Sequence, residues 1–219
     1  MSEVQKALAV CALDTMPQDW QPVGVEAQIA QAAGRSALRV FLEPGRRRGT
    51  LGVDFGDEPT FVLSPLAICD GVVEVDLLSR LLPDAPDYAR GFVGIAYRVQ
   101  EFAQAYESVY LRPLNGLRLN PPPPRNLRAV QYYAYPEWKF DRLREEEPEG
   151  GYEAPADIAP DEWMTFGVEL DGPRVIARVN GREVFHLTHA KSEPREGRIG
   201  LWVDIGTDAY FSNLRVARR

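Results

Sequence analysis

Polar and aromatic side chains occupy alternate positions in several strand-like segments of this chain. In 92–99, 108–112, 129–135 and 199–203, apolar residues recur at every second position, so one face of each segment belongs to a core. The opposite faces share a set of larger polar and aromatic residues: Arg98, Tyr110, Arg112, Gln131, Tyr133 and Trp202. Aromatic rings offer flat apolar area to sugar C–H groups, and arginine and glutamine offer planar hydrogen-bonding groups to hydroxyls or carboxylates.

This set predicts a site for a carbohydrate or a small acidic ligand if the segments are neighbours in one sheet. Gly94 and Ala96 fall on the same face and leave space beside the larger side chains. The alternative is that tyrosine and arginine on an exposed sheet face form cross-strand pairs and bind nothing. Alternation also fails wherever a bulge intervenes, because a bulge moves the following residues to the other face.

Glu107 is the carboxylate that directly precedes one of these segments. Alternation puts it on the core side together with Val109. It could be a buried partner of an arginine, a catalytic acid with a raised pKa, or an edge residue that faces water. Its place at the start of a strand favours the last of these.

Metal and cofactor signals are sparse. His186 and His189, the two histidines, would face opposite sides of a strand, and no Gly-x-Ser-x-Gly elbow accompanies them. We expect no cofactor, although the loop 204–208, with Asp204 and Asp208, could offer oxygen ligands to Ca²⁺. Cys11 and Cys69 are expected to be two free, partly buried thiols, with a disulfide as the alternative.

Hairpin signals dominate the last quarter of the chain. Asp171-Gly172 and Asn180-Gly181 separate alternating apolar segments, and this is a strong short-range indication of a β-hairpin. Further strand patterns occur upstream, including one at 51–55 and one at 72–78. Together, about a dozen short strands predict an all-β fold, a two-sheet antiparallel jelly-roll sandwich.

The domain prediction is an N-terminal arm, 1–21, followed by a single β-sandwich domain, 22–219. The prolines Pro121–Pro124 offer no N–H donors and are expected to form a stiff loop within that domain. The charged segment 141–149 is expected to be a solvated loop.

Charge and hydropathy narrow the range of partners. The net charge of −7 argues against a nucleic-acid backbone as the main partner, because such binding needs clustered Lys and Arg. No apolar stretch reaches membrane-spanning length. The apolar segment 7–13 makes a poor signal peptide, which favours the cytoplasm, or else export through a signal that this sequence lacks. The sequence leaves the oligomeric state open.

Several segments resemble bacterial concanavalin A-like lectin/glucanase domains. They include Asp70–Asp76, Phe92–Val99, Tyr106–Pro113, Gln131-Tyr132, and Gly197–Val203 leading to Phe211–Leu214. The resemblance covers about 22–217 and includes laminin G-like modules and 3-keto-disaccharide or other glycoside hydrolases. It implies a single jelly-roll sandwich. From the polar and aromatic face beside Gly94 and Ala96 we expect this domain to bind a sugar on its concave sheet. The alternative, which rests on the Tyr106-Glu107 segment opposite the arginines, is a glycoside hydrolase-like enzyme that uses Glu107 as acid/base.

The residues implied by the resemblance overlap the alternating set without matching it. The distinctive segments hold Tyr106, Glu107, Tyr110, Arg112, Gln131 and Tyr132, so Glu107 and Tyr132 disagree with the face assigned by alternation. Residues 74–79 also resemble the opening of the Glu-x-Asp-x-x-Glu signature of retaining β-glucanases, which need two carboxylates about 5 Å apart. Ser79 replaces the last acidic residue, so the predicted acid/base is missing there and the match is interpreted as fortuitous.

Overall fold

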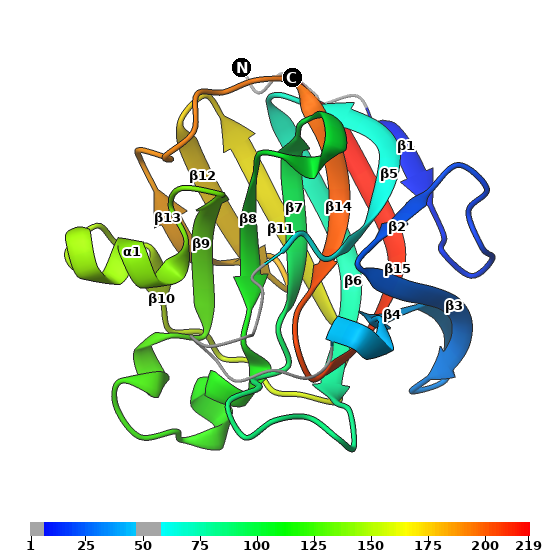
Figure 1. Cartoon of the computed structure of the whole chain (residues 1–219), viewed down its shortest axis with the longest axis horizontal. Coiled ribbons are helices and arrows are strands. Elements are labelled where there is room, and N and C mark those ends of the chain that lie inside the picture. Colours follow the sequence, from blue (N-terminus) through cyan, green and yellow to red (C-terminus); the bar gives the residue numbers. More distant parts are fainter. Residues whose placement is uncertain (1–6, 47–57) are drawn as a thin grey trace.

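Two antiparallel sheets pack face to face in the computed structural model, which describes residues 7–46 and 58–219 (Figure 1). The predicted two-sheet sandwich is confirmed. The strand predicted at 51–55 lies outside the described residues.

The first sheet has eight strands in the order β13-β12-β11-β6-β15-β4-β3, with β1 paired to β15 off this path. Its strands are β1 (Ala7–Cys11), β3 (Val25–Ala32), β4 (Arg35–Leu42), β6 (Gly71–Leu81), β11 (Met164–Asp171), β12 (Arg174–Val179), β13 (Arg182–Leu187) and β15 (Thr207–Arg218). Strand β1 belongs to the segment predicted as an N-terminal arm, and it pairs with β15 from Ala7↔Ala217 to Cys11↔Leu214.

The second sheet has seven strands in the order β10-β9-β8-β7-β14-β5-β2. Its strands are β2 (Gln21–Val23), β5 (Phe61–Ile68), β7 (Val93–Val99), β8 (Tyr106–Leu111), β9 (Val130–Tyr135), β10 (Glu153–Ala154) and β14 (Gly197–Val203). Short 3₁₀ turns occupy Pro44–Arg46, Glu101–Ala103, Pro113–Asn115, Leu117–Leu119 and Arg125–Leu127. Three of these turns lie in the long connection from β8 to β9, which also contains the proline run.

The predicted hairpins are confirmed. Strands β11 and β12 meet at Gly172, which has φ +55°, and β12 and β13 meet at Asn180 and Gly181, with φ values of +50° and +77°. Two successive positive φ values define the type I′ turn that suits the right-handed twist of paired strands, and Asn-Gly is the dipeptide that tolerates it best.

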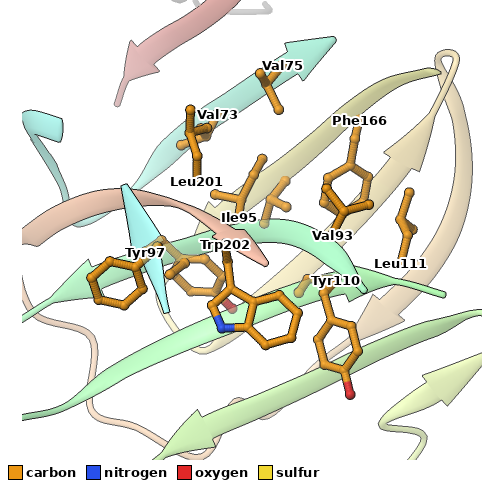
Figure 2. Close-up of a cluster of buried hydrophobic side chains, with 14 of the residues drawn as sticks. Val73, Val75, Val93, Ile95, Tyr97, Tyr110, Leu111, Phe166, Leu201 and Trp202 are labelled. Atoms are coloured by element: carbon orange, nitrogen blue, oxygen red, sulfur yellow. The ribbon is translucent and has the colours of Figure 1, made fainter. Parts of the chain in front are cut away.

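The core lies between the two sheets. Val73 and Val75 from β6 face Ile95 and Leu201 from β7 and β14, and all four side chains are fully buried (Figure 2). Full burial of such a side chain contributes about 1.5–3 kcal/mol. Neighbouring Trp202 points away from this cluster, which follows from strand alternation and defines an outer face of the seven-stranded sheet.

The charged segment 141–149 was predicted to be a loop, and this prediction is wrong over most of its length. Residues Phe140–Glu146 form the helix α1, which lies beside β9. Leu143 is buried, and Arg142 Nε donates to Glu146 Oε1 over 2.8 Å, one helical turn later. A single buried leucine among charged residues is too weak a periodic signal to be recognised. No helix in 7–46 and 58–219 is long and apolar enough to cross a membrane.

Candidate functional site

Strand register brings four of the predicted site residues to the outer face of the seven-stranded sheet. Gly94 of β7 lies opposite Tyr110 of β8 and Trp202 of β14, and Tyr110 lies opposite Gln131 of β9. Tyr133 follows Gln131 by two positions and therefore shares its face. Strands β14, β7, β8 and β9 are therefore adjacent in one sheet, as the predicted site requires.

Aromatic rings pack against one another on this face. The ring centroids of Tyr110 and Trp202 are 4.6 Å apart, and that of Tyr133 lies 5.9 Å from Tyr110 and 5.8 Å from Trp202. Gly94 allows β8 to approach β7 closely beneath these rings: a Cβ there would lie 2.4 Å from the Val109 carbonyl oxygen and 2.5 Å from the Tyr110 Cα. The three rings form a rigid floor, each with no more than 6% of its surface exposed.

Arg112, which directly follows β8, forms hydrogen bonds with residues of this floor and of the neighbouring strands. It is buried, and its Nη2 donates to the Tyr110 hydroxyl over 2.7 Å and to Gln131 Oε1 over 3.0 Å. Its Nη1 donates to Glu153 Oε1 of β10 over 2.6 Å. Burial raises the pKa of Tyr110 to about 12 against the opposing positive charge of Arg112, so the phenol remains protonated at neutral pH.

Glu153 is shared by three arginines. Besides Arg112, Arg144 Nε donates to Glu153 Oε2 over 2.9 Å, and Arg128 Nε lies 3.1 Å from the same oxygen. Burial would raise the pKa of Glu153, but the hydrogen bond from Arg144 and the charge of Arg112 outweigh it and hold this pKa below its ordinary value. The carboxylate is therefore ionised and organises the arginines around it.

A cavity of about 500 Å³ opens beside this cluster, at one end of the outer face. Because Trp202 is part of its lining, we call it the cavity over Trp202. Its aromatic lining comprises Tyr88, Phe92, Tyr110, Tyr133, Phe140 and Trp202. Its cationic lining comprises Arg90, Arg112, Arg125, Arg128, Lys139 and Arg144. The floor comes from the strands, and the walls come from the loop before β7, the connection from β8 to β9, and the start of α1.

Arg98 does not join the outer face, and the prediction that placed it there is wrong. Arg198 of β14 pairs with Val99 and Gly200 pairs with Ala96, so one additional residue of β7 bulges between them. Arg98 has φ +53° at this bulge, and the guanidinium turns to the end of the sandwich. There it donates to the carbonyl oxygens of Cys69 and Gly172.

Glu107 does not face water, contrary to the expectation for it. Its side chain is 1% exposed, and Arg98 Nη1 donates to its Oε2 over 2.9 Å. The Tyr132 hydroxyl donates to Oε1 over 2.6 Å and accepts from the Lys191 N–H over 2.7 Å. Burial raises the pKa of Glu107 against the opposing effects of Tyr132 and Arg98. The buried-partner interpretation is the one that the contacts match.

Glu107, Arg98 and Arg112 therefore do not converge in one cleft. Glu107 and Tyr132 share the inner side of the sheet with Val109, as alternation predicts, whereas Arg112 contacts the outer face. A second, smaller cavity of about 330 Å³ is lined by Glu107 together with Tyr106 and Trp138. It is separate from the cavity over Trp202.

The β-glucanase-like motif lies in the other sheet. Asp76 of β6 accepts hydrogen bonds from Thr165 Oγ1 over 2.8 Å and from Asn213 Nδ2 over 2.9 Å. The Ser79 hydroxyl donates to the Gly91 carbonyl over 2.7 Å. These are cross-strand and loop contacts, consistent with a fortuitous match.

Asp208 of the predicted calcium loop is bonded to other side chains. It accepts from Arg39 Nε over 2.6 Å and from the Tyr210 hydroxyl over 3.0 Å. Within the described part of the chain, no three His, Cys, Asp or Glu side chains gather as metal ligands would. Cys11 and Cys69 are free and partly buried, as predicted.

A sequence model of the 3-keto-alpha-glucoside-1,2-lyase-like domain matches residues 73–217, which is more than half of the chain. The chain belongs to this family. The matched range of the 3-keto-alpha-glucoside-1,2-lyase-like domain runs from β6 to β15 and includes the strands of the cavity floor. No curated protein sequence matches the chain.

Solved structures share the fold. The carbohydrate-binding module CBM66 from Bacillus subtilis is 17% identical, with a TM-score of 0.55 over 90% of this chain and 93% of its own. A galectin-like protein of unknown function from Bacillus subtilis is 11% identical, with a TM-score of 0.58 over both full chains. A Bacillus licheniformis β-glucanase is 10% identical, with a TM-score of 0.54 over 99% of this chain and 100% of its own. The family match and this shared fold together bear out the suspected concanavalin A-like, 3-keto-disaccharide hydrolase-like resemblance.

The walls of the cavity could not be predicted from strand alternation. Arg90, Arg125, Phe140 and Arg144 stand in loops or in α1, where strand alternation carries no information, and Glu153 stands in a two-residue strand. The available signal was the recurrence of arginine around the proline run, at positions 112, 118, 125 and 128.

Proposed function

We propose that the domain binds a carbohydrate in the cavity at the end of the outer face. The observation that carries this proposal is the combination of aromatic walls with a fixed hydrogen-bonding cluster around Arg112 in one cavity. Its volume of about 500 Å³ falls in the range of about 300–1,000 Å³ typical of small-molecule sites.

The chemistry of the lining suits a saccharide. The half-buried rings of Tyr88, Phe92 and Phe140 offer apolar area to sugar C–H groups. Arginine and asparagine side chains beside them offer donors and acceptors to hydroxyls. Family membership and the fold shared with CBM66 and a β-glucanase support the same class of ligand.

Binding is preferred here to glycoside hydrolysis because of where the carboxylates lie. Glu107, the acid/base of the hydrolytic alternative, lines the smaller cavity instead, with its side chain 1% exposed and bonded to Arg98 and Tyr132. The acidic side chains in the cavity lining are Asp141 and Asp204, and a catalytic reaction at this site would have to draw on them. Analysis of the glycans for cleavage products after incubation distinguishes the two functions.

The test is a glycan array followed by calorimetry on the strongest ligand, with wild type, Phe140→Ala and Phe102→Ala. Phe140 lines the cavity, whereas Phe102 is 96% exposed at the turn between β7 and β8. We expect Phe140→Ala to weaken binding about tenfold, equivalent to about 1.4 kcal/mol, and Phe102→Ala to match wild type. Absence of glycan binding by the wild-type protein would remove the proposal.

A further inference from the structure

Positive charge is concentrated in the cavity over Trp202, although the protein as a whole is acidic. The chain has a net charge of −7, yet the lining of this cavity has six Arg or Lys side chains and two Asp side chains among the described residues. A concave site with a locally positive charge attracts anionic ligands and raises their concentration there.

Glu153 offsets this charge incompletely. Arg112, Arg128 and Arg144 all lie within ion-pair distance of its carboxylate, so one negative charge serves three guanidinium groups. Arg144 uses Nε and Nη2 for Glu153 and stacks its guanidinium 5.0 Å from the Phe140 ring centroid. The side of this cluster that faces the cavity therefore remains cationic.

Arg90 and Arg125 add two further positive charges to the lining of the cavity. Within the described residues neither forms an ion pair with a carboxylate. Arg90 Nη1 donates to the carbonyl oxygens of Asp87 and Ala89, each over 2.6 Å, and Arg125 Nε donates to Asn115 Oδ1 over 3.2 Å. Backbone and amide acceptors position these side chains without neutralising them.

The like charges repel one another. Burial, followed by the charges of Arg125 and Arg112, lowers the pKa of Arg90 and outweighs the opposing charge of Asp87. An anion that presents two oxygens would relieve this repulsion, because the guanidinium fork donates to such groups in a bidentate arrangement.

We propose that the saccharide bound in this cavity carries an anionic substituent, a uronate carboxylate or a sulfate ester, which Arg90 and Arg125 receive while the aromatic walls contact the sugar ring. This inference rests on the proposed carbohydrate-binding function and narrows its ligand to acidic glycans. Both substituents present oxygens to the same donors, so they are separated by experiment.

The first measurement compares matched glycans that carry a uronate, a sulfate ester or neither, on one array and then by calorimetry. We expect acidic glycans to bind at least about tenfold more tightly than their neutral counterparts, and this advantage to shrink as salt is raised. The acidic glycan that binds more tightly, the uronate or the sulfate ester, identifies the substituent. Neutral glycans that bind as tightly as acidic ones would overturn the inference and leave the proposed function intact, whereas no binding at all would overturn both.

The second measurement uses Arg125→Gln, Arg125→Lys and the control Arg182→Gln. Arg182 is exposed on β13 in the other sheet, so its substitution changes the net charge equally without altering the cavity. We expect Arg125→Gln to weaken acidic-glycan binding about tenfold, and Arg125→Lys to retain part of the salt dependence. Arg182→Gln should bind as wild type does. Acidic-glycan binding that is equal in Arg125→Gln and wild type, with Arg90→Gln also unchanged, would contradict the assignment.

Discussion

Arg98 and Glu107 form a buried ion pair with 2.9 Å between Arg98 Nη1 and Glu107 Oε2, at the end of the sandwich and away from the cavity over Trp202. Arg98 reaches on to Asp70 and to the Gly172 carbonyl of the β11–β12 turn, while Tyr132 connects Glu107 to Lys191. The pair thus joins the two sheets and the loop before β14. We interpret it as a structural pair.

Replacing Glu107 by Gln should destabilise the fold and leave glycan binding unchanged. The substitution leaves the Arg98 guanidinium buried without its counter-charge, and breaking a buried pair in this way costs about 3–5 kcal/mol. Urea unfolding followed by calorimetry on the folded variant measures both effects. A fully stable Glu107→Gln protein with abolished glycan binding would instead support a role in the ligand site.

The coupling between the two residues can be measured directly. A double-mutant cycle with Arg98→Met and Glu107→Gln should give an interaction free energy of about 1–3 kcal/mol, because the second substitution removes a charge that the first has already isolated. Strictly additive effects would show that the two side chains act independently.

Glu153 should make the protein sensitive to acid. Its pKa is lowered in the folded state, so its contribution to stability is fully present above the ordinary value of 4.5 and is lost as the pH falls through the folded value. Protonation would also leave the positive charges of Arg112, Arg128 and Arg144 together without their shared anion. The free energy of unfolding should therefore fall as the pH drops from about 5 to 3.

Glu153→Gln isolates this effect. The variant should be less stable than wild type at pH 7, and the difference should narrow as the pH falls towards 3. Glu145→Gln, an exposed substitution on α1, serves as the control and should unfold as wild type does. A constant gap between Glu153→Gln and wild type across this range would contradict the coupling of Glu153 to the three arginines.

Gly94→Ala should disturb the aromatic floor. A methyl group there would meet the backbone of Val109 and Tyr110 at 2.4–2.5 Å, so β7 and β8 would have to separate. We expect a loss of about 1–3 kcal/mol in the free energy of unfolding, as for other overpacked positions. Gly45→Ala is the matched control because a Cβ at Gly45 meets nothing within 4 Å. Equal stability of the two variants would refute the close approach.

The fold and the residues on the floor of the site could be predicted from the sequence. Asn180-Gly181 predicted a hairpin correctly because few dipeptides tolerate two positive φ values. Tyr110, Gln131 and Trp202 were placed on one face because β8, β9 and β14 keep a regular register at these positions. Where a strand is unbroken, alternation alone determines the face.

The position of Arg98 and the walls of the cavity depend on structural features that strand alternation cannot predict. Arg98 was misplaced because a bulge and a positive φ turn it out of register, and nothing in the local residue types marks that bulge. The cavity walls come from loops and from α1, whose seven residues make about two turns and are too few to show a helical period. The role proposed for Arg90 and Arg125 could not be predicted from the sequence, because only folding brings these two residues to one cavity.

Calorimetric titration of the array-selected glycan into wild type and Phe140→Ala tests the central claim, that the cavity over Trp202 binds carbohydrate, most directly. We predict saturable binding by wild type and about tenfold weaker binding by Phe140→Ala, with unfolding curves that show both proteins folded. Saturable binding that is identical in the two proteins would place the ligand elsewhere on the molecule and contradict the account.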